Sequence, residues 1–328
     1  MIMNEKIKPY VAACVQAATA AFDTERTLEK LRDLTADAAR AKAKTVLFPE
    51  AFIGGYPRGA SFGAVLGSRT PEGREQFLMY HSAAIDVPGP VVTELASIAK
   101  QNALQLTVGV IERDRGTLYC TVLFFAADGQ YLGKHRKLMP TAMERLVWGF
   151  GDGSTLPVYD TEIGRIGSVI CWENYMPLMR AAMYGQGIQV YMAPTADPRP
   201  IWVTSMQHIA AEGRCFVLST NQFARRSDYP ADYVSNLPDD PEAIVCRGGA
   251  CIVDPFGNLL AGPLWDQEGV VTAEINPADI PKAQYDFDPV GHYSRPDVFS
   301  LVVDRSEKRA VRYDDAGQVM KSKDGTGE

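Results

Sequence analysis

The sequence predicts an α/β protein of two mixed β-sheets with helices outside them, packed as layers. Strand-like apolar runs recur along the 328 residues, and some alternate with helical patterns while others are paired as hairpins. Helical crossovers join parallel strands and hairpins join antiparallel ones, so the combination indicates mixed sheets. With 46% hydrophobic and 22% charged residues, the chain can bury a sizeable core.

The first predicted elements alternate between strand and helix. Residues 10–16 (YVAACVQ) form a predicted strand. A helix capped by Asp23 or Thr24 is expected next, because apolar residues then recur at helical spacing: Leu28, Leu31, Leu34 and Ala38. Residues 45–50 (TVLFPE) are a short buried strand that Pro49 stops. The pattern then predicts a helix over 89–102 and a strand over 104–112.

Hairpins are more frequent in the rest of the chain. Asp128-Gly129 suits a tight turn between strands 117–126 and 130–137, and a second hairpin over 157–171 turns near Gly164. The other predicted elements are helices over about 177–185 and 200–213, strands over 188–194 and 215–222, a hairpin over 248–264 and a last strand over 268–275.

We expect one domain over residues 1–300, because no internal repeat or composition break marks a boundary. Residues 301–328 are rich in charge and poor in apolar side chains over most of their length. They are therefore expected to form a tail beyond the core, either disordered or at an interface between copies.

Charge and composition argue against several classes of protein. A formal net charge of −7 disfavours nucleic acid or an acidic membrane surface as partner. No apolar run reaches the ~18 residues of a membrane span, and the start (MIMNEKIKPY) lacks a secretory signal, so we expect a cytoplasmic protein. The six cysteines form no CxxC pair and the four histidines are scattered, so we expect reduced thiols and no metal.

Three residues with reactive side chains stand at or just after the ends of strand-like runs: Glu50, Lys137 and Cys171. Reactive groups in α/β proteins are commonly displayed at strand ends. A thiolate is a nucleophile, and both a nearby lysine and the start of a helix after Cys171 would lower the thiol pKa. Each residue also has an ordinary interpretation, as a packed thiol, a solvated turn carboxylate and a surface charge respectively.

Four longer segments resemble the nitrilase branch of the carbon–nitrogen hydrolase superfamily. They appear in the family's order and are FPEAFIGGYPRG (48–59), KHRKLMPTAMERLVWGFGDGS (134–154), GSVICWENYMPLMRAAMYGQGIQVYMAPTAD (167–197) and DPVGHYSRPDV (288–298). The resemblance implies a four-layer α-β-β-α sandwich. It also implies a homodimer that builds into larger oligomers, spirals or filaments.

The resemblance implies catalytic roles for Glu50, Lys137 and Cys171, and places a second glutamate at Glu144. Glu144 would position Lys137 or a water molecule, although a salt bridge at the start of a helix is its simpler interpretation. The implied reaction is hydrolysis of an organic nitrile to carboxylic acid and ammonia through a cysteine thioimidate and thioester, without a cofactor.

Four residues flanking these motifs are candidates for the substrate pocket: Tyr56, Trp148, Trp172 and Thr195. Aromatic walls suit an apolar substituent, although the same side chains could be plain core. An amidase or a cyanide-degrading enzyme of the same superfamily would use the same catalytic residues. Two other classes of protein are possible alternatives, a non-catalytic assembly protein and a thiol redox protein. The former would be expected to lack one catalytic residue, and the latter needs a resolving cysteine close to Cys171.

Overall fold

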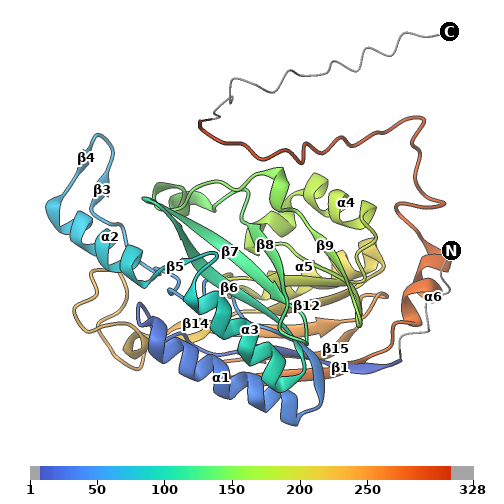
Figure 1. The fold of residues 1–328 in the computed structure, drawn as a ribbon, viewed down its shortest axis with the longest axis horizontal. Coiled ribbons are helices and arrows are strands. Elements are labelled where there is room, and N and C mark those ends of the chain that lie inside the picture. The colour runs from blue at the N-terminus through green and yellow to red at the C-terminus, as the bar shows by residue number, and fades with distance from the viewer. Residues whose placement is uncertain (1–7, 312–328) are drawn as a thin grey trace, which may run out of the picture.

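The computed structural model describes residues 8–311 of the chain. Two seven-stranded sheets dominate it (Figure 1). In the first, the order is β16-β1-β2-β6-β7-β8, with β5 paired to β6. Its strands are β1 (Tyr10–Gln16), β2 (Ala43–Leu47), β5 (Ile85–Asp86), β6 (Gln105–Asp114), β7 (Thr117–Phe125), β8 (Tyr131–Arg136) and β16 (Gly269–Ile275).

The second sheet has the order β13-β14-β12-β11-β10-β9, with β15 paired to β14. Its strands are β9 (Val158–Thr161), β10 (Gly164–Ser168), β11 (Val190–Pro194), β12 (Phe216–Thr220), β13 (Phe223–Arg225), β14 (Ile244–Val253) and β15 (Leu259–Trp265). Both sheets are mixed, as predicted: β2 is parallel to β1 and β6, β11 is parallel to β10 and β12, and the hairpin pairs are antiparallel. A short hairpin, β3 (Ala64–Val65) and β4 (Ser68–Arg69), stands apart.

The layers follow from the alternation of side chains along each strand. One face of β1 and one face of β12 meet in a core between the two sheets, which includes Ala12, Cys14, Phe216 and Leu218. The opposite faces of the central strands are buried too, against the helices. This accounts for the near-continuous apolar runs in the sequence.

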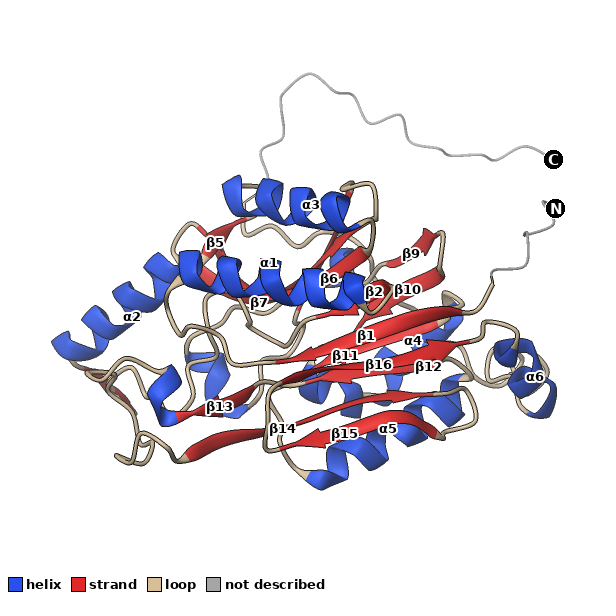
Figure 2. Cartoon of the chain, turned by 90° about the horizontal axis from the view of Figure 1, so that it is seen from below, coloured by secondary structure: helices blue, strands red, loops and turns tan. Residues whose placement is uncertain are grey.

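Helices cover the two outer faces (Figure 2). The helices α1 (Thr24–Arg40) and α3 (Pro90–Asn102) pack on the first sheet, and α4 (Pro177–Gly185) and α5 (Pro200–Gly213) pack on the second. The result is a four-layer α-β-β-α sandwich, which confirms the predicted fold class. Sequence analysis missed α2 (Pro71–Ala83) and α6 (Asp279–Asp286).

The chain beyond α6 is extended, and Figure 1 shows it leaving the layers as an arm. The arm touches the body at the 152–153 turn, where the backbone N–H of Lys308 donates to Asp152 Oδ2 at 2.8 Å. Of the predicted tail, residues 312–328 lie outside the described range. Within residues 8–311, no helix is both long and apolar enough to cross a bilayer.

Candidate active site

Glu50, Lys137 and Cys171 each follow the end of a strand: β2, β8 and β10. Strands β2 and β8 belong to one sheet and β10 belongs to the other. All three residues are buried, and Cys171 is part of the core between the sheets. Glu50 and Lys137 are 87 positions apart in the sequence, and Cys171 is farther still from Glu50. The fold brings all three to the junction of the two sheets.

Close backbone packing positions Glu50. Phe48 donates its N–H to the Thr107 carbonyl at 2.9 Å, so the chain continues alongside β6 beyond the end of β2. At Gly109, a Cβ atom would stand 2.2 Å from the Pro49 carbonyl oxygen and 2.8 Å from Glu50 Cα. Only glycine permits this approach, and a side chain at position 109 would displace Glu50.

The ammonium group of Lys137 lies between two carboxylates. Its Nζ donates to Glu50 Oε1 at 2.6 Å and to Glu144 Oε2 at 2.7 Å. Glu144 lies in the 3₁₀ helix Ala142–Leu146 and also accepts the backbone N–H of Thr141 at 2.6 Å. The two interpretations of Glu144 are thus compatible, since one carboxylate both starts the helix and holds Lys137. The Tyr56 hydroxyl donates to its other oxygen at 2.7 Å.

The two oxygens of Glu50 have different surroundings. Oε1 accepts from Lys137 and from the Cys120 thiol, whose Sγ is 3.5 Å away. Oε2 is buried and has no hydrogen-bond partner among the described residues. It is therefore the oxygen that is free to take a proton from a thiol or a water molecule.

Cys171 sits on a sharp turn. Its φ of +51° places this residue in the left-handed region, which side chains other than glycine rarely occupy. Such strain is concentrated at functional sites. The Thr195 hydroxyl donates to Cys171 Sγ at 3.2 Å. The expected helix directly after the thiol is only the 3₁₀ helix Cys171–Tyr175, and α4 starts at Pro177, so the predicted helix-dipole effect on the thiol is small.

The electrostatics differ from the sequence-based expectation for the thiol. Burial raises the pKa of Cys171, the charges of Glu50 and Glu144 raise it further, and Lys137 with the Thr195 bond lowers it only in part. Burial also raises the pKa of Glu50, against the opposing charge of Lys137. Burial alone would lower the pKa of Lys137, but its acidic neighbours outweigh burial and raise it. The resting thiol is therefore protonated, next to a carboxylate with an increased affinity for protons.

The four candidate pocket residues have different environments. Tyr56 and Thr195 contact Glu144 and Cys171 directly. Trp148 is buried core, but Lys137 Nζ lies 5.4 Å from the centre of its ring, within cation–π range. Trp172 is half-exposed, and its indole N–H donates to Asp197 Oδ2 at 2.8 Å. Three of the four therefore contact the catalytic candidates, and Trp172 adjoins Cys171 in the chain.

Sequence analysis missed three further residues of the site. Cys120 was interpreted as a packed thiol, although it contacts Glu50. Glu173 and His135 form a buried pair at 2.9 Å. The sequence held a signal for His135 alone: it lies in β8 two positions before Lys137, the spacing that puts alternate strand residues on one face.

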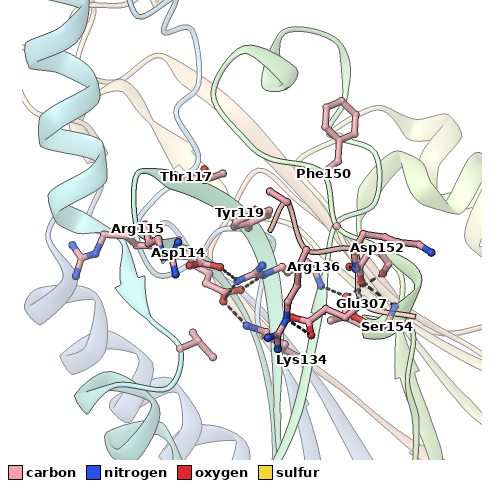
Figure 3. A pocket seen from close by; sticks show the side chains of 18 of the residues that line it. Asp114, Arg115, Thr117, Tyr119, Lys134, Arg136, Phe150, Asp152, Ser154 and Glu307 are labelled. Atoms are coloured by element: carbon pink, nitrogen blue, oxygen red, sulfur yellow. Dashed lines mark hydrogen bonds and ion pairs between the residues drawn. The ribbon is translucent and has the colours of Figure 1, made fainter. Parts of the chain in front are cut away.

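A pocket of about 950 Å³ lies elsewhere, over the outer ends of β6, β7 and β8 (Figure 3). It is lined by charged side chains that pair with one another, including Lys134, Arg136 and Asp114. None of the catalytic candidates lines it.

Comparisons with known proteins identify the family to which this chain belongs. The family model described as carbon-nitrogen hydrolase matches residues 11–285. The chain is 55% identical over 317 residues to the bifunctional nitrilase/nitrile hydratase NIT4A of Lupinus angustifolius, covering 95% of this chain and 91% of the relative. It is 57% identical over 300 residues to the aliphatic nitrilase of Sinorhizobium fredii, covering 92% and 97%.

Solved structures show the same fold at low sequence identity. The carbon-nitrogen hydrolase from Helicobacter pylori has a TM-score of 0.70 at 19% identity, covering 89% of this chain and 97% of that one. Nit3 of Saccharomyces cerevisiae has a TM-score of 0.68 at 20% identity, covering 89% and 99%. At these identities the likeness concerns the fold alone.

Proposed function

This chain belongs to the carbon–nitrogen hydrolase family and is a nitrilase, and from that premise we propose how its buried site converts an organic nitrile to a carboxylic acid and ammonia. The observation that carries the proposal is the Lys137 ammonium held at 2.6 Å from Glu50, with the Cys171 thiol buried in the same site. A base, a cation and a nucleophile are the parts that covalent hydrolysis needs.

The first step forms a carbon–sulfur bond. Glu50 takes the thiol proton as the sulfur attacks the nitrile carbon, and passes that proton to the nitrile nitrogen, which leaves a thioimidate on Cys171. The raised pKa values of Cys171 and Glu50 suit a proton that moves during the attack rather than before it. Lys137 stabilises the negative charge that develops on nitrogen, together with a backbone N–H near Trp172.

The later steps use two water molecules. Glu50 deprotonates the first, which adds to the thioimidate and gives a tetrahedral intermediate. Loss of ammonia leaves a thioester, and the second water breaks the carbon–sulfur bond to release the acid and the free thiol. Glu144 keeps Lys137 in place through both additions, through its bond of 2.7 Å.

The tetrahedral intermediate can also break its carbon–sulfur bond before ammonia leaves, and the product is then an amide. A panel of aliphatic, aromatic and arylacetonitrile substrates, with hydrogen cyanide and matched amides, tests the proposal by the ammonia, acid and amide formed. We expect acid from a nitrile without prior build-up of free amide. Hydrolysis of amides alone would identify an amidase, and turnover of cyanide alone a cyanide-degrading enzyme.

Replacing Tyr56 with phenylalanine removes the hydroxyl that donates to Glu144. A hydrogen bond to a buried charged group contributes about 1.5–3 kcal/mol, so we expect kcat/KM for a nitrile to fall about tenfold or more. Tyr10→Phe is a matched control, because its hydroxyl bonds the Ile163 carbonyl at 2.9 Å, away from the catalytic residues. Equal kcat/KM values for the two variants would contradict the role given to Tyr56.

We propose that the protein forms homodimers that build into larger assemblies. Four large apolar side chains are exposed where the second sheet's helices begin: Trp172, Tyr175, Leu178 and Ile201. The arm exposes a second apolar group, which includes Phe299 and Val302. Exposed large apolar side chains that gather on one part of a protein are typical of interfaces.

The double variant Leu178→Glu, Ile201→Glu is expected to give a smaller species than the wild type. The two side chains are 68% and 55% exposed, so the charges are tolerated in a single chain but would have to be desolvated at an interface. Light scattering after size-exclusion chromatography measures the mass, and circular dichroism checks that the variant is folded. An unchanged mass would place the interface elsewhere, and Phe299→Glu then tests the arm.

Two further expectations remain proposals. We propose that residues 1–300 form one catalytic domain and that a tail follows it. We also propose that the protein is located in the cytoplasm. All six cysteines are free and buried, which suits a reducing compartment.

A further inference from the structure

The fully buried carboxylate of Glu173 joins the two segments that carry Lys137 and Cys171. Its Oε1 accepts the backbone N–H of Leu138 at 2.5 Å, and Leu138 directly follows Lys137. Its Oε2 accepts the backbone N–H of Ile170 at 2.8 Å, and Ile170 directly precedes Cys171. One side chain thus links the two sheets at the positions next to the ammonium and the thiol.

His135, two residues before Lys137 in the chain, is the third hydrogen-bond partner of the Glu173 carboxylate. Its Nε2 lies 2.9 Å from Glu173 Oε2, and its Nδ1 lies 2.6 Å from the carbonyl oxygen of Thr155. A carbonyl oxygen only accepts, so Nδ1 carries a proton. Both oxygens of Glu173 already act as acceptors for backbone N–H groups, so we assign Nε2 as the donor in its contact with Oε2. His135 is therefore an imidazolium paired with a carboxylate.

Resting on the proposed function, in which Lys137 and Cys171 act on one substrate carbon, we propose that Glu173 and His135 are positioning residues that set the separation between the ammonium and the sulfur. Neither side chain touches the reacting atoms, since Glu173 binds the neighbouring backbone amides instead. A displacement of about 1 Å at a reacting centre can cost a hundredfold in rate, so two short bonds at these positions have a large effect.

The charged groups that face His135 are Glu173, across the sheet interface, and Lys137, on its own segment. Burial lowers the pKa of His135 and Lys137 adds to that, but the charge and hydrogen bond of Glu173 outweigh both and raise it. The raised pKa and the two acceptors that face the ring nitrogens both favour the imidazolium form of His135.

The test compares two buried carboxylates that both bind residues of β8. Glu173→Gln replaces one carboxylate oxygen with an NH₂ group, which cannot accept a hydrogen bond. The NH₂ group must face at least one of the three N–H donors, and the resulting clash displaces a backbone segment. Glu112 is the control, because it binds Lys134 and Arg136 on the opposite face of the strand, where Figure 3 shows both side chains at the charged pocket. Both variants are expected to melt at a lower temperature than the wild type.

Only Glu173→Gln is expected to lose activity when folded protein is assayed. We expect its kcat for nitrile hydrolysis to fall at least tenfold, with KM within about threefold of wild type, and Glu112→Gln to keep its kcat. The double variant His135→Gln, Glu173→Gln should cost no more than Glu173→Gln alone, because the two residues act as one unit. A wild-type kcat in Glu173→Gln, or additive losses in the double variant, would overturn the proposal.

A spectroscopic measurement on the wild type tests the ion pair of His135 and Glu173, on which the proposal depends, even if the variants do not fold. Nitrogen-15 NMR of histidine-labelled protein should show one of the four histidines with both ring nitrogens protonated from pH 6 to 8, without titrating. A single protonated nitrogen on the buried histidine would refute the ion pair. Failure of the proposed function looks different: the wild type itself would not hydrolyse nitriles.

Discussion

Replacing Cys171 with alanine is expected to abolish ammonia release from every nitrile that the wild type hydrolyses, with a loss of at least about 10⁴-fold in kcat. Neither of the two neighbouring groups can replace the sulfur, since Thr195 only donates to it at 3.2 Å and the Cys120 thiol is turned to Glu50 Oε1. Colorimetric detection of ammonia under substrate saturation measures the loss.

Cys215→Ala is the matched control for this experiment. Cys215 is also free and buried, but it belongs to the core between the second sheet and its helices. Its removal should leave kcat unchanged and lower stability by about 1 kcal/mol. Mass spectrometry of acid-quenched wild type should in addition find an acyl group on the peptide containing Cys171. A Cys171→Ala protein that retained more than about a thousandth of the wild-type rate would rule out the covalent route.

The second large effect is expected for Lys137→Met, in both stability and activity. The change keeps the length of the side chain but leaves two carboxylates, Glu50 and Glu144, without their cation in a buried site. Removing one partner of a buried ion pair destabilises a protein by about 3–5 kcal/mol. Denaturant unfolding at pH 7.5 measures this loss, and nitrile turnover of the remaining folded protein should fall at least about a hundredfold.

The stability deficit of Lys137→Met should grow as the pH rises. Without the opposing charge of Lys137, the already raised pKa of Glu50 rises further in the folded variant. A carboxyl with a higher pKa in the folded state binds a proton on folding, and this favours the folded state at low pH. That contribution declines as the pH climbs from the unfolded value of about 4.3 through the folded value. The deficit relative to wild type is therefore smaller at pH 5 than at pH 8.

Lys134→Met serves as the control, three residues earlier in the chain. Lys134 is partly exposed and shares Glu112 with Arg136, so Glu112 keeps one cation when Lys134 is lost. We expect a change in stability below about 1 kcal/mol, and unchanged turnover. If Lys137→Met were as stable as Lys134→Met, or if its deficit shrank at high pH, the buried pair would not have the energetic role assigned to it.

Local patterns predicted the regular elements well where the sequence marks both ends. The helices α4 and α5 begin at Pro177 and Pro200 and end at Gly185 and Gly213, as the sequence analysis expected. Helix α2 was missed because its buried face carries small and polar side chains, among them Gly73 and Gln76, so no apolar period marks it. Short strands such as β5 and β13 exist only through their pairing with longer ones.

The sequence alone determined which chemical groups stand at the strand ends: a carboxylate, an ammonium and a thiol, each after an apolar run. Resemblance to a family added Glu144 and the four-layer fold. Only the tertiary structure decided how these groups interact, because burial and charge depend on residues far apart in the chain. Glu50 and Lys137 are 87 positions apart, yet their side chains are 2.6 Å apart. The same reason explains why the resting thiol is protonated, against the local prediction: burial raises its pKa by more than Lys137 lowers it.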